Sequence, residues 1–274
     1  MVLSLVLGTV VGIIMGLTGA GGGILAVPLL VFGLQLSVVQ AGPIGLLAVG
    51  ISATVGSLIG LKNNIVRYRA ALLIAGTGIL LAPLGVWLAQ RLNTGLLSVV
   101  FAAVLAWVAY KTFKEAGALD NGDDTKRLEL PCLRDAEKGR FVWTSTCARV
   151  LTLSGGVAGF LSGLLGVGGG FVVVPALQRY TDLNTRAVVA TSLAVIALVS
   201  LAGVASSIAT EQLNIAVALP FAVGGAVGMG AGTLLSPRLS QKNLKLSFAV
   251  ICAAVSIGMF VKSLAIGLHG PVTS

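Results

Sequence analysis

Apolar residues dominate the chain in eight long blocks, separated by short polar turns and one longer polar stretch. The blocks cover residues 2–33, 37–61, 68–90 and 94–113, then 147–178, 185–209, 213–236 and 244–267. A helix needs roughly 20 apolar residues to cross a bilayer, and every block reaches that length. The pattern therefore predicts an all-α polytopic membrane protein.

The composition supports this class, because 56% of the residues are hydrophobic and 10% are charged, against about 25% charged in soluble domains. No charged residue precedes Lys62, and 15 of the 27 charged residues lie between Lys111 and Arg149. The net charge of +9 does not indicate nucleic-acid binding, because most cations flank apolar blocks, as membrane topology requires. The N-terminus lacks the basic region of a cleaved signal, so we expect it to belong to the first membrane segment.

The chain repeats itself at an offset of 147 residues. Residues 16–28 read GLTGAGGGILAVP, and residues 163–175 read GLLGVGGGFVVVP. The register holds without a gap from about residue 8 to about residue 105. We predict two homologous halves, residues 1–113 and 145–274, joined by a polar linker at 114–144.

The leading block of each half is long and broken by glycines, so it forms either one broken helix or a hairpin of two short helices. Hairpins place 16 of the 18 Lys and Arg residues on one side of the membrane, and single crossings place about 12 there. The larger asymmetry favours hairpins, which give each half an odd number of crossings. We therefore expect two inverted repeats, each a short-helix hairpin plus three transmembrane helices, about ten membrane segments in all. The linker is then cytoplasmic.

Glycine clusters at the two breaks are the first candidates for a substrate site. They are Gly19, Gly21, Gly22 and Gly23 in the first half, and Gly166, Gly168, Gly169 and Gly170 in the second. The helix that resumes after each cluster exposes amide groups that bind anions without a charged side chain. Tight helix packing is the alternative, and it accounts better for the glycines spaced by four at Gly8, Gly12 and Gly16 and at their counterparts.

Hydroxyl groups and missing acids indicate the sign of the ligand. Thr191 and Ser192 lie early in the block after the second break, where they can donate to an anionic oxygen. Back-bonding to a helix carbonyl is the alternative. No Asp, Glu or His lies deep in any apolar block, so neither a proton relay nor a cation site is predicted. These features favour a small anionic substrate.

The sequence shows no catalytic constellation. It offers no Ser/His arrangement, paired Asp or metal-ligand cluster, so we expect no enzyme, no metal and no cofactor. Cys132, Cys147 and Cys252 have no metal spacing and no pairing pattern. The expected roles are a linker thiol and two packing residues.

The motifs resemble the sulfite exporter TauE/SafE family, also called 4-toluene sulfonate uptake permeases. The resemblance rests on Gly-x-x-Gly-x-Gly-Gly-Gly-x-x-x-x-Pro in both halves and on Ala190-Thr-Ser-Leu193, and it covers nearly the whole chain except the linker. It implies an inner-membrane permease for small sulfur-containing anions, with the glycine clusters and the Thr-Ser pair as substrate contacts. The first half departs from this pattern, because Pro43-Ile-Gly45 stands where the family has Ala-Thr-Ser.

We therefore expect a secondary permease that moves a small oxyanion, sulfite or an organosulfonate, across the bacterial inner membrane by alternating access. Its expected partners are the anion and the lipid bilayer, and no nucleic acid. A passive anion channel with a backbone-lined filter is the alternative. An intramembrane enzyme is a third hypothesis that no motif supports. No feature of the sequence predicts an oligomeric state.

Overall fold

Helices form almost all of the regular structure. The computed structural model describes residues 1–118, 132, 144–209, 214–235 and 241–268, so most of the predicted linker lies outside the described residues. The first half contains α1 (Val2–Thr18), the 3-10 helix η1 (Ala20–Leu25), α2 (Ala26–Gly33), α3 (Val38–Lys62), α4 (Tyr68–Arg91) and α5 (Thr94–Ala118). The second half contains α6 (Ser145–Leu165), α7 (Gly170–Tyr180), α8 (Thr185–Ala209), α9 (Ile215–Leu235) and α10 (Gln241–Leu268). The all-α prediction is confirmed for this part of the chain.

Seven of the described helices are long and apolar enough to cross a membrane, namely α3, α4, α5, α6, α8, α9 and α10. The chain is therefore a multi-pass membrane protein. Of the remaining helices, α1 has 17 residues and α7 has 11. The apolar blocks predicted three long helices per half, and the second half has a fourth, α6. Its 21 residues begin two positions before the apolar block and continue to the glycine cluster.

Both leading blocks reverse direction at the glycine cluster. In the first half, a Cβ at Gly33, the last residue of α2, would lie 2.6 Å from Leu7 Cδ1 in α1. In the second half, Thr181 follows α7 and pairs with Cys132, which is bonded to Cys147 in the first turn of α6. Each leading block is thus a hairpin that returns along its own first helix.

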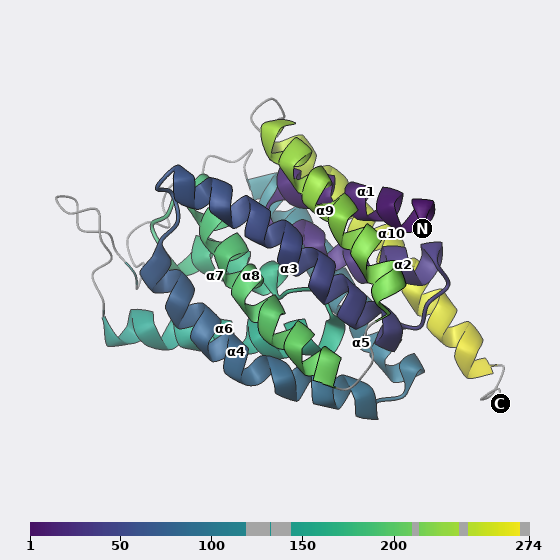
Figure 1. Cartoon of the computed structure of the whole chain (residues 1–274). Coiled ribbons are helices and arrows are strands. Elements are labelled where there is room, and N and C mark those ends of the chain that lie inside the picture. Colours follow the sequence, from purple (N-terminus) through teal and green to yellow (C-terminus); the bar gives the residue numbers. More distant parts are fainter. Residues whose placement is uncertain (119–131, 133–143, 210–213, 236–240, 269–274) are drawn as a thin grey trace.

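The principal helix pairs join one half of the chain to the other. Helix α1 packs along α9, α4 along α6, α3 along α8, and α5 along α10. Figure 1 shows the purple α1 beside the green α9, and α4 beside α6. At the 147-residue offset, α1 corresponds to α6 and α4 to α9, so the α1–α9 and α4–α6 pairs are counterparts of each other. Helix α3 corresponds to α8 and α5 to α10, so each of these two pairs joins a helix to its own counterpart. The packing therefore repeats the internal symmetry of the sequence.

Counterpart helices run in opposite directions where they meet. In the α3–α8 pair, Gly60 lies against Ala190, whereas Gly50 lies against Ser200. Helices α5 and α10 are also antiparallel, because Ser256 Oγ donates to the Ala102 carbonyl, whereas Lys245 pairs with Glu115. The two halves therefore contribute these helices with reversed chain direction.

Glycine residues allow the α1–α9 and α4–α6 pairs to approach until their backbones touch. A side chain at Gly12 would overlap the backbone of Gly225 in α9, and one at Gly159 would overlap that of Gly78 in α4. Small residues spaced by four bring membrane helices into such contact. The packing interpretation of these spaced glycines is confirmed.

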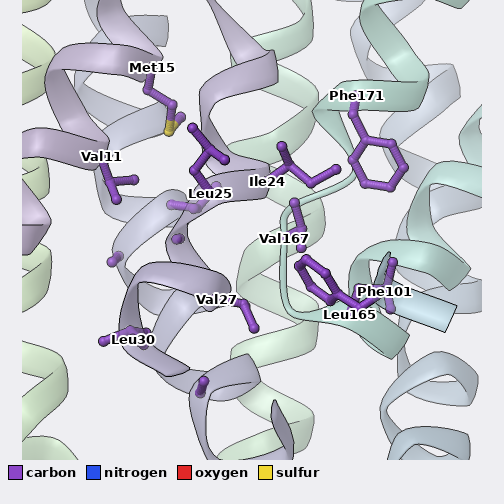
Figure 2. Close-up of a cluster of buried hydrophobic side chains, with 14 of the residues drawn as sticks. Val11, Met15, Ile24, Leu25, Val27, Leu30, Phe101, Leu165, Val167 and Phe171 are labelled. Atoms are coloured by element: carbon purple, nitrogen blue, oxygen red, sulfur yellow. The ribbon is translucent and has the colours of Figure 1, made fainter. Parts of the chain in front are cut away.

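The apolar core surrounds the two hairpins. Ile24 in the first hairpin and Val167 and Phe171 in the second are at most 4% exposed, and Phe101 of α5 packs in the same cluster (Figure 2). On the outside of the bundle, large apolar side chains such as Leu80 are exposed (76%). A broad apolar outer surface suits lipid tails rather than water.

Turn residues define where several helices begin. Ser37 and Gln40 form a capping box at the start of α3, and Asn184 Oδ1 accepts the N–H of Ala187 at 2.9 Å in the first turn of α8. Such side chains satisfy amide groups that the helix itself leaves unpaired.

Two glycines of α4 provide a matched test of this packing. We expect Gly78→Leu to lower the free energy of unfolding by ~1–3 kcal/mol or more, because the larger side chain must separate α4 from α6 and α8. Gly76→Leu is the control, since a Cβ there meets nothing within 4 Å. Thermal melting in detergent, followed by size-exclusion chromatography, measures both variants. Equal melting temperatures would contradict the packing account.

Candidate functional site

The two hairpin tips meet inside the protein. A Cβ at Gly23 would lie 3.1 Å from the carbonyl oxygen of Val167 in the other hairpin. Four residues of the clusters have positive φ, between 70° and 78°: Gly19, Gly166, Gly168 and Gly169. Glycine adopts this conformation without steric cost, so the clusters permit the sharp reversals.

The helices that resume after the two tips begin differently. In the second half, α7 begins at Gly170, directly after the left-handed residue Gly169. In the first half, η1 follows the turn, and α2 begins only at Ala26. Neither α2 nor α7 has a side-chain cap at its N-terminus. The second tip therefore carries a helix N-terminus among its glycines, whereas the first tip carries a 3-10 turn.

The glycine clusters are packed rather than open. Gly22 lies so close to α1 that a Cβ there would be 2.5 Å from the Met15 nitrogen, and Gly168 contacts Val49 and Ile196. Gly21 is part of η1 beside them. The buried cluster residues are Gly19, Gly22, Gly23, Gly166, Gly168, Gly169 and Gly170. Their role as substrate contacts stays a prediction.

Thr191 and Ser192 are fully buried in α8 and have protein partners. Thr191 Oγ1 accepts the N–H of Arg67 at 3.1 Å, which fastens the turn before α4. Ser192 Oγ donates to the Val189 carbonyl at 2.9 Å, a bond of the back-bonding type. In this conformation both hydroxyls support the fold, and their contact with substrate also stays a prediction.

One large cavity, about 580 Å³ in volume, lies beside the hairpin tips. It is lined by the last turns of α1, α3, α5 and α9, by α7, and by the first turns of α8 and α10. We call this cavity the vestibule. We call the side of the molecule where α3, α5 and α9 end and where α8 and α10 begin the linker face. Of the ten predicted contact residues, Gly19 lines the vestibule, and the other nine lie outside its lining.

The vestibule carries more positive than negative charge. Its charged lining residues in the described part of the chain are Lys111, Arg186, Lys245 and Glu115. Glu115 pairs with Lys245, with 3.5 Å between Oε2 and Nζ. Both side chains are partly exposed, so we call this end of the vestibule its mouth. Three cations and one carboxylate give a net charge of +2. Such a lining concentrates anions.

Lys111 and Arg186 were not among the predicted contacts, because in the sequence they read as topological charges near the ends of apolar blocks. The repeat offers no signal either. At the 147-residue offset, Arg186 stands where the first half has Val39. In an inverted repeat that counterpart lies on the opposite membrane face, where topology requires no cation.

Ser200 is a further polar group at the tips and was not among the predicted contacts. Its hydroxyl is buried without a hydrogen-bond partner, and it lies 3.2 Å from the position of a Cβ at Gly168. An unsatisfied buried hydroxyl is costly and calls for a reason such as a ligand or water. Ser200 replaces Ala53 of the first half, so the second tip is again the more polar one.

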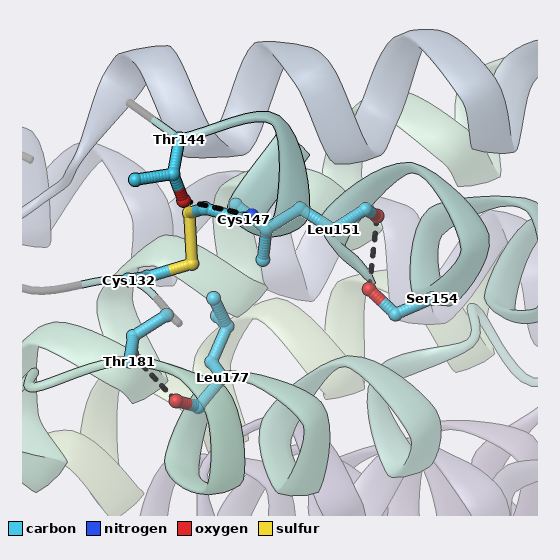
Figure 3. The surroundings of a disulfide bond; sticks show 7 residues. All are labelled: Cys132, Thr144, Cys147, Leu151, Ser154, Leu177 and Thr181. Atoms are coloured by element: carbon cyan, nitrogen blue, oxygen red, sulfur yellow. Dashed lines mark hydrogen bonds between the residues drawn. A yellow bond between two sulfur atoms is a disulfide. The ribbon is translucent and has the colours of Figure 1, made fainter. Parts of the chain in front are cut away.

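Cys132 and Cys147 form a disulfide, with a Cα–Cα distance of 5.1 Å (Figure 3). The expectation of an unpaired linker thiol and a packing residue is therefore wrong for this pair. Their proximity depends on the fold of the α6–α7 hairpin, to which Cys132 also bonds through the bridge with Thr181. Cys252 is a free, buried cysteine, as the packing interpretation predicted.

Comparisons with known proteins agree with this architecture. The family model described as "Sulfite exporter TauE/SafE" matches residues 4–259. A "Probable membrane transporter protein" of Xylella fastidiosa is 30% identical over 265 residues, which cover 93% of each chain. The "Probable membrane transporter protein YunE" of Bacillus subtilis is 26% identical, over 94% of this chain and 98% of its own. No solved structure matches the chain.

Proposed function

The chain belongs to the sulfite exporter TauE/SafE family of membrane transporters, and we propose that it is a secondary permease for a small oxyanion, sulfite or an organosulfonate. The observation that carries this proposal is the vestibule, which combines a net positive lining with a floor at the first hairpin tip. No described lining residue other than Glu115 is acidic. This balance of charge favours an anion over a cation.

The route of the anion follows from the order of the lining groups. Lys111 and Arg186 attract the anion near the mouth, where solvent still surrounds it. Gly19 receives it at the floor of the vestibule. The amide groups at the start of α7 and the Ser200 hydroxyl then replace its hydration, because an uncapped helix N-terminus and an unpaired hydroxyl are both donors. Thr191 and Ser192 join this set when α8 moves.

The shape of the protein supports a carrier rather than an open channel. On the other side of the hairpin tips from the vestibule, the described residues enclose a crevice of about 20 Å³. A continuous pore would need open space on both sides of the tips. A vestibule open on one side fits one state of alternating access across the bacterial inner membrane.

We also propose that the two halves are inverted repeats. The antiparallel pairing of α3 with α8 and of α5 with α10 supports this assignment, because these helices are counterparts in the repeat. Each hairpin returns to its own side, so each half contributes three full crossings. The hairpin tips then enter from opposite membrane faces and meet near the middle.

The linker face carries 16 of the 18 Lys and Arg residues under this arrangement, so we propose that it is cytoplasmic. The Cys132–Cys147 disulfide lies on the same face, whereas disulfides persist mainly in oxidising compartments. We assign the orientation in the membrane from the sixteen Lys and Arg residues rather than from the one disulfide. In the cytoplasm this bond would be open to reduction by the thiol pool.

Arg186 and Arg179 form a matched pair for testing the site. Both lie close to the turn between α7 and α8, but only Arg186 lines the vestibule. In proteoliposomes with labelled sulfoacetate or sulfite, we expect Arg186→Gln to raise the half-saturating concentration by about fivefold, as the loss of ~1 kcal/mol from one charge pair would produce. Arg179→Gln should leave it unchanged. Equal effects of the two substitutions would refute the assignment.

The orientation has its own test at Asn63, which lines the vestibule mouth and is exposed. Asn63→Cys is placed in a protein whose native cysteines have been replaced, and intact cells are treated with a membrane-impermeant maleimide. We expect labelling only after the membrane is permeabilised. Labelling of intact cells would place the linker face outside and would agree with a stable disulfide there.

A further inference from the structure

A small crevice lies beyond the hairpin tips, away from the vestibule. It is lined by the first turns of α3 and α5 and by the last turns of α4, α6 and α8. These are the opposite ends of α3, α5 and α8 from those that line the vestibule. The crevice, which we call the far crevice, therefore points toward the membrane face opposite the linker face.

The far crevice is built from the repeat counterparts of the vestibule. Ten of its twelve lining residues fall on vestibule residues when shifted by 147 positions. Six of the ten are Val38, Gly42, Leu46, Leu97, Gly163 and Ser207, which correspond in order to Thr185, Val189, Leu193, Leu244, Gly16 and Gly60. The other two fall on residues 236 and 237, outside the described part of the chain. Corresponding residues of the two halves thus line a vestibule of about 580 Å³ and a far crevice of about 20 Å³.

The contact of each hairpin tip with the helix that faces it differs between the two places. At the far crevice, a Cβ at Gly166 would overlap the backbone of Gly42 in α3. The counterpart pair at the vestibule is Gly19 and Val189, where the Val189 Cγ2 atom lies 2.7 Å from the position of a Cβ at Gly19. Backbone meets backbone on the shut side, whereas a valine side chain stands between helix and tip on the open side.

We infer that the far crevice is the shut form of a second substrate vestibule on the opposite membrane face, and that the Gly42–Gly166 contact is its gate. This inference rests on the proposed permease function. Corresponding residues of the two halves are packed loosely around the vestibule and tightly around the far crevice, and transport exchanges these two arrangements. Helix α3 leaves the second tip while α8 closes on the first. Packed interfaces switch between discrete arrangements of this kind rather than deforming continuously.

Two counterpart residues serve as reporters of the two sides. Leu17 lines the vestibule and is half-buried, and Leu164 lines the far crevice and is 7% exposed. Leu17→Cys and Leu164→Cys are made separately in the full-length chain whose three native cysteines have been replaced by alanine. The rate of modification by a water-soluble methanethiosulfonate is then measured on the purified protein. We expect rapid modification of the first reporter and slow modification of the second.

Two substitutions, one on each side of the hairpin tips, should both favour the state in which the far crevice is open and the vestibule is shut. Gly42→Val gives the gate the valine that the open side has. Its Cβ would lie 3.8 Å from the Gly166 Cα, in ordinary contact, so the two γ-methyl groups are what must separate α3 from the second tip. Val189→Gly removes that valine and lets α8 close on the first tip. We expect each to speed modification of Leu164→Cys about tenfold and to slow that of Leu17→Cys, as a shift of ~1.4 kcal/mol between the states would produce. Gly76→Val, at a position with open space around it, should change neither rate.

Reciprocity distinguishes a gate from local damage. Faster modification of Leu164→Cys without slower modification of Leu17→Cys would mean that the far side has only loosened, and it would overturn the inference. Unchanged rates with Val189→Gly, the less disruptive change, would overturn it as well. Because the labelling needs no substrate, reciprocal rates in a protein that moves no oxyanion would refute the proposed substrate and leave the gate standing.

Discussion

Backbone contact through glycine is the interaction on which the rest of the structure depends. Membrane helices gain little from apolar burial against one another, because lipid is as apolar as their side chains, so close van der Waals packing must hold them together. Here that packing joins the halves crosswise, with α1 against α9 and α4 against α6. Each first helix of a hairpin is thereby held against a spanning helix of the other half. The glycine tips can then meet in the interior and leave the vestibule on one side.

Much of the fold was predictable because the bilayer restricts the choices. Long apolar blocks must be helices, the offset of 147 residues indicates two halves, and the placement of Lys and Arg favours hairpins over single crossings. The disulfide and the length of α6 were not predictable, because they depend on where the chain returns in space. Among the predicted substrate contacts, Gly19 lines the vestibule, while Thr191 and Ser192 bond to neighbouring backbone. Which glycines face open space depends on how distant helices pack around them, and that information is not local in sequence.

The halves share a fold but differ in chemistry. The second tip has a helix N-terminus among its glycines and the unpaired Ser200 hydroxyl beside them, and its own half supplies Arg186 at the mouth of the vestibule. The first half has Ala53 and Val39 at the positions of Ser200 and Arg186. A symmetric scaffold supplies two related packings, and the unequal side chains make the linker face the more cationic entrance. Under the proposed mechanism, an anion binds more tightly from that face than from the other.

Counterflow in proteoliposomes tests the central claim, transport of an oxyanion by alternating access, most directly. Vesicles containing the purified protein are loaded with unlabelled sulfoacetate and diluted into a trace of the labelled anion, with sulfite as a second substrate. A carrier that exposes one site to one side at a time predicts a transient accumulation of label above its equilibrium level, driven by exit of the unlabelled anion. Simple equilibration of the label, with no overshoot at any internal concentration, would contradict the account and favour a channel.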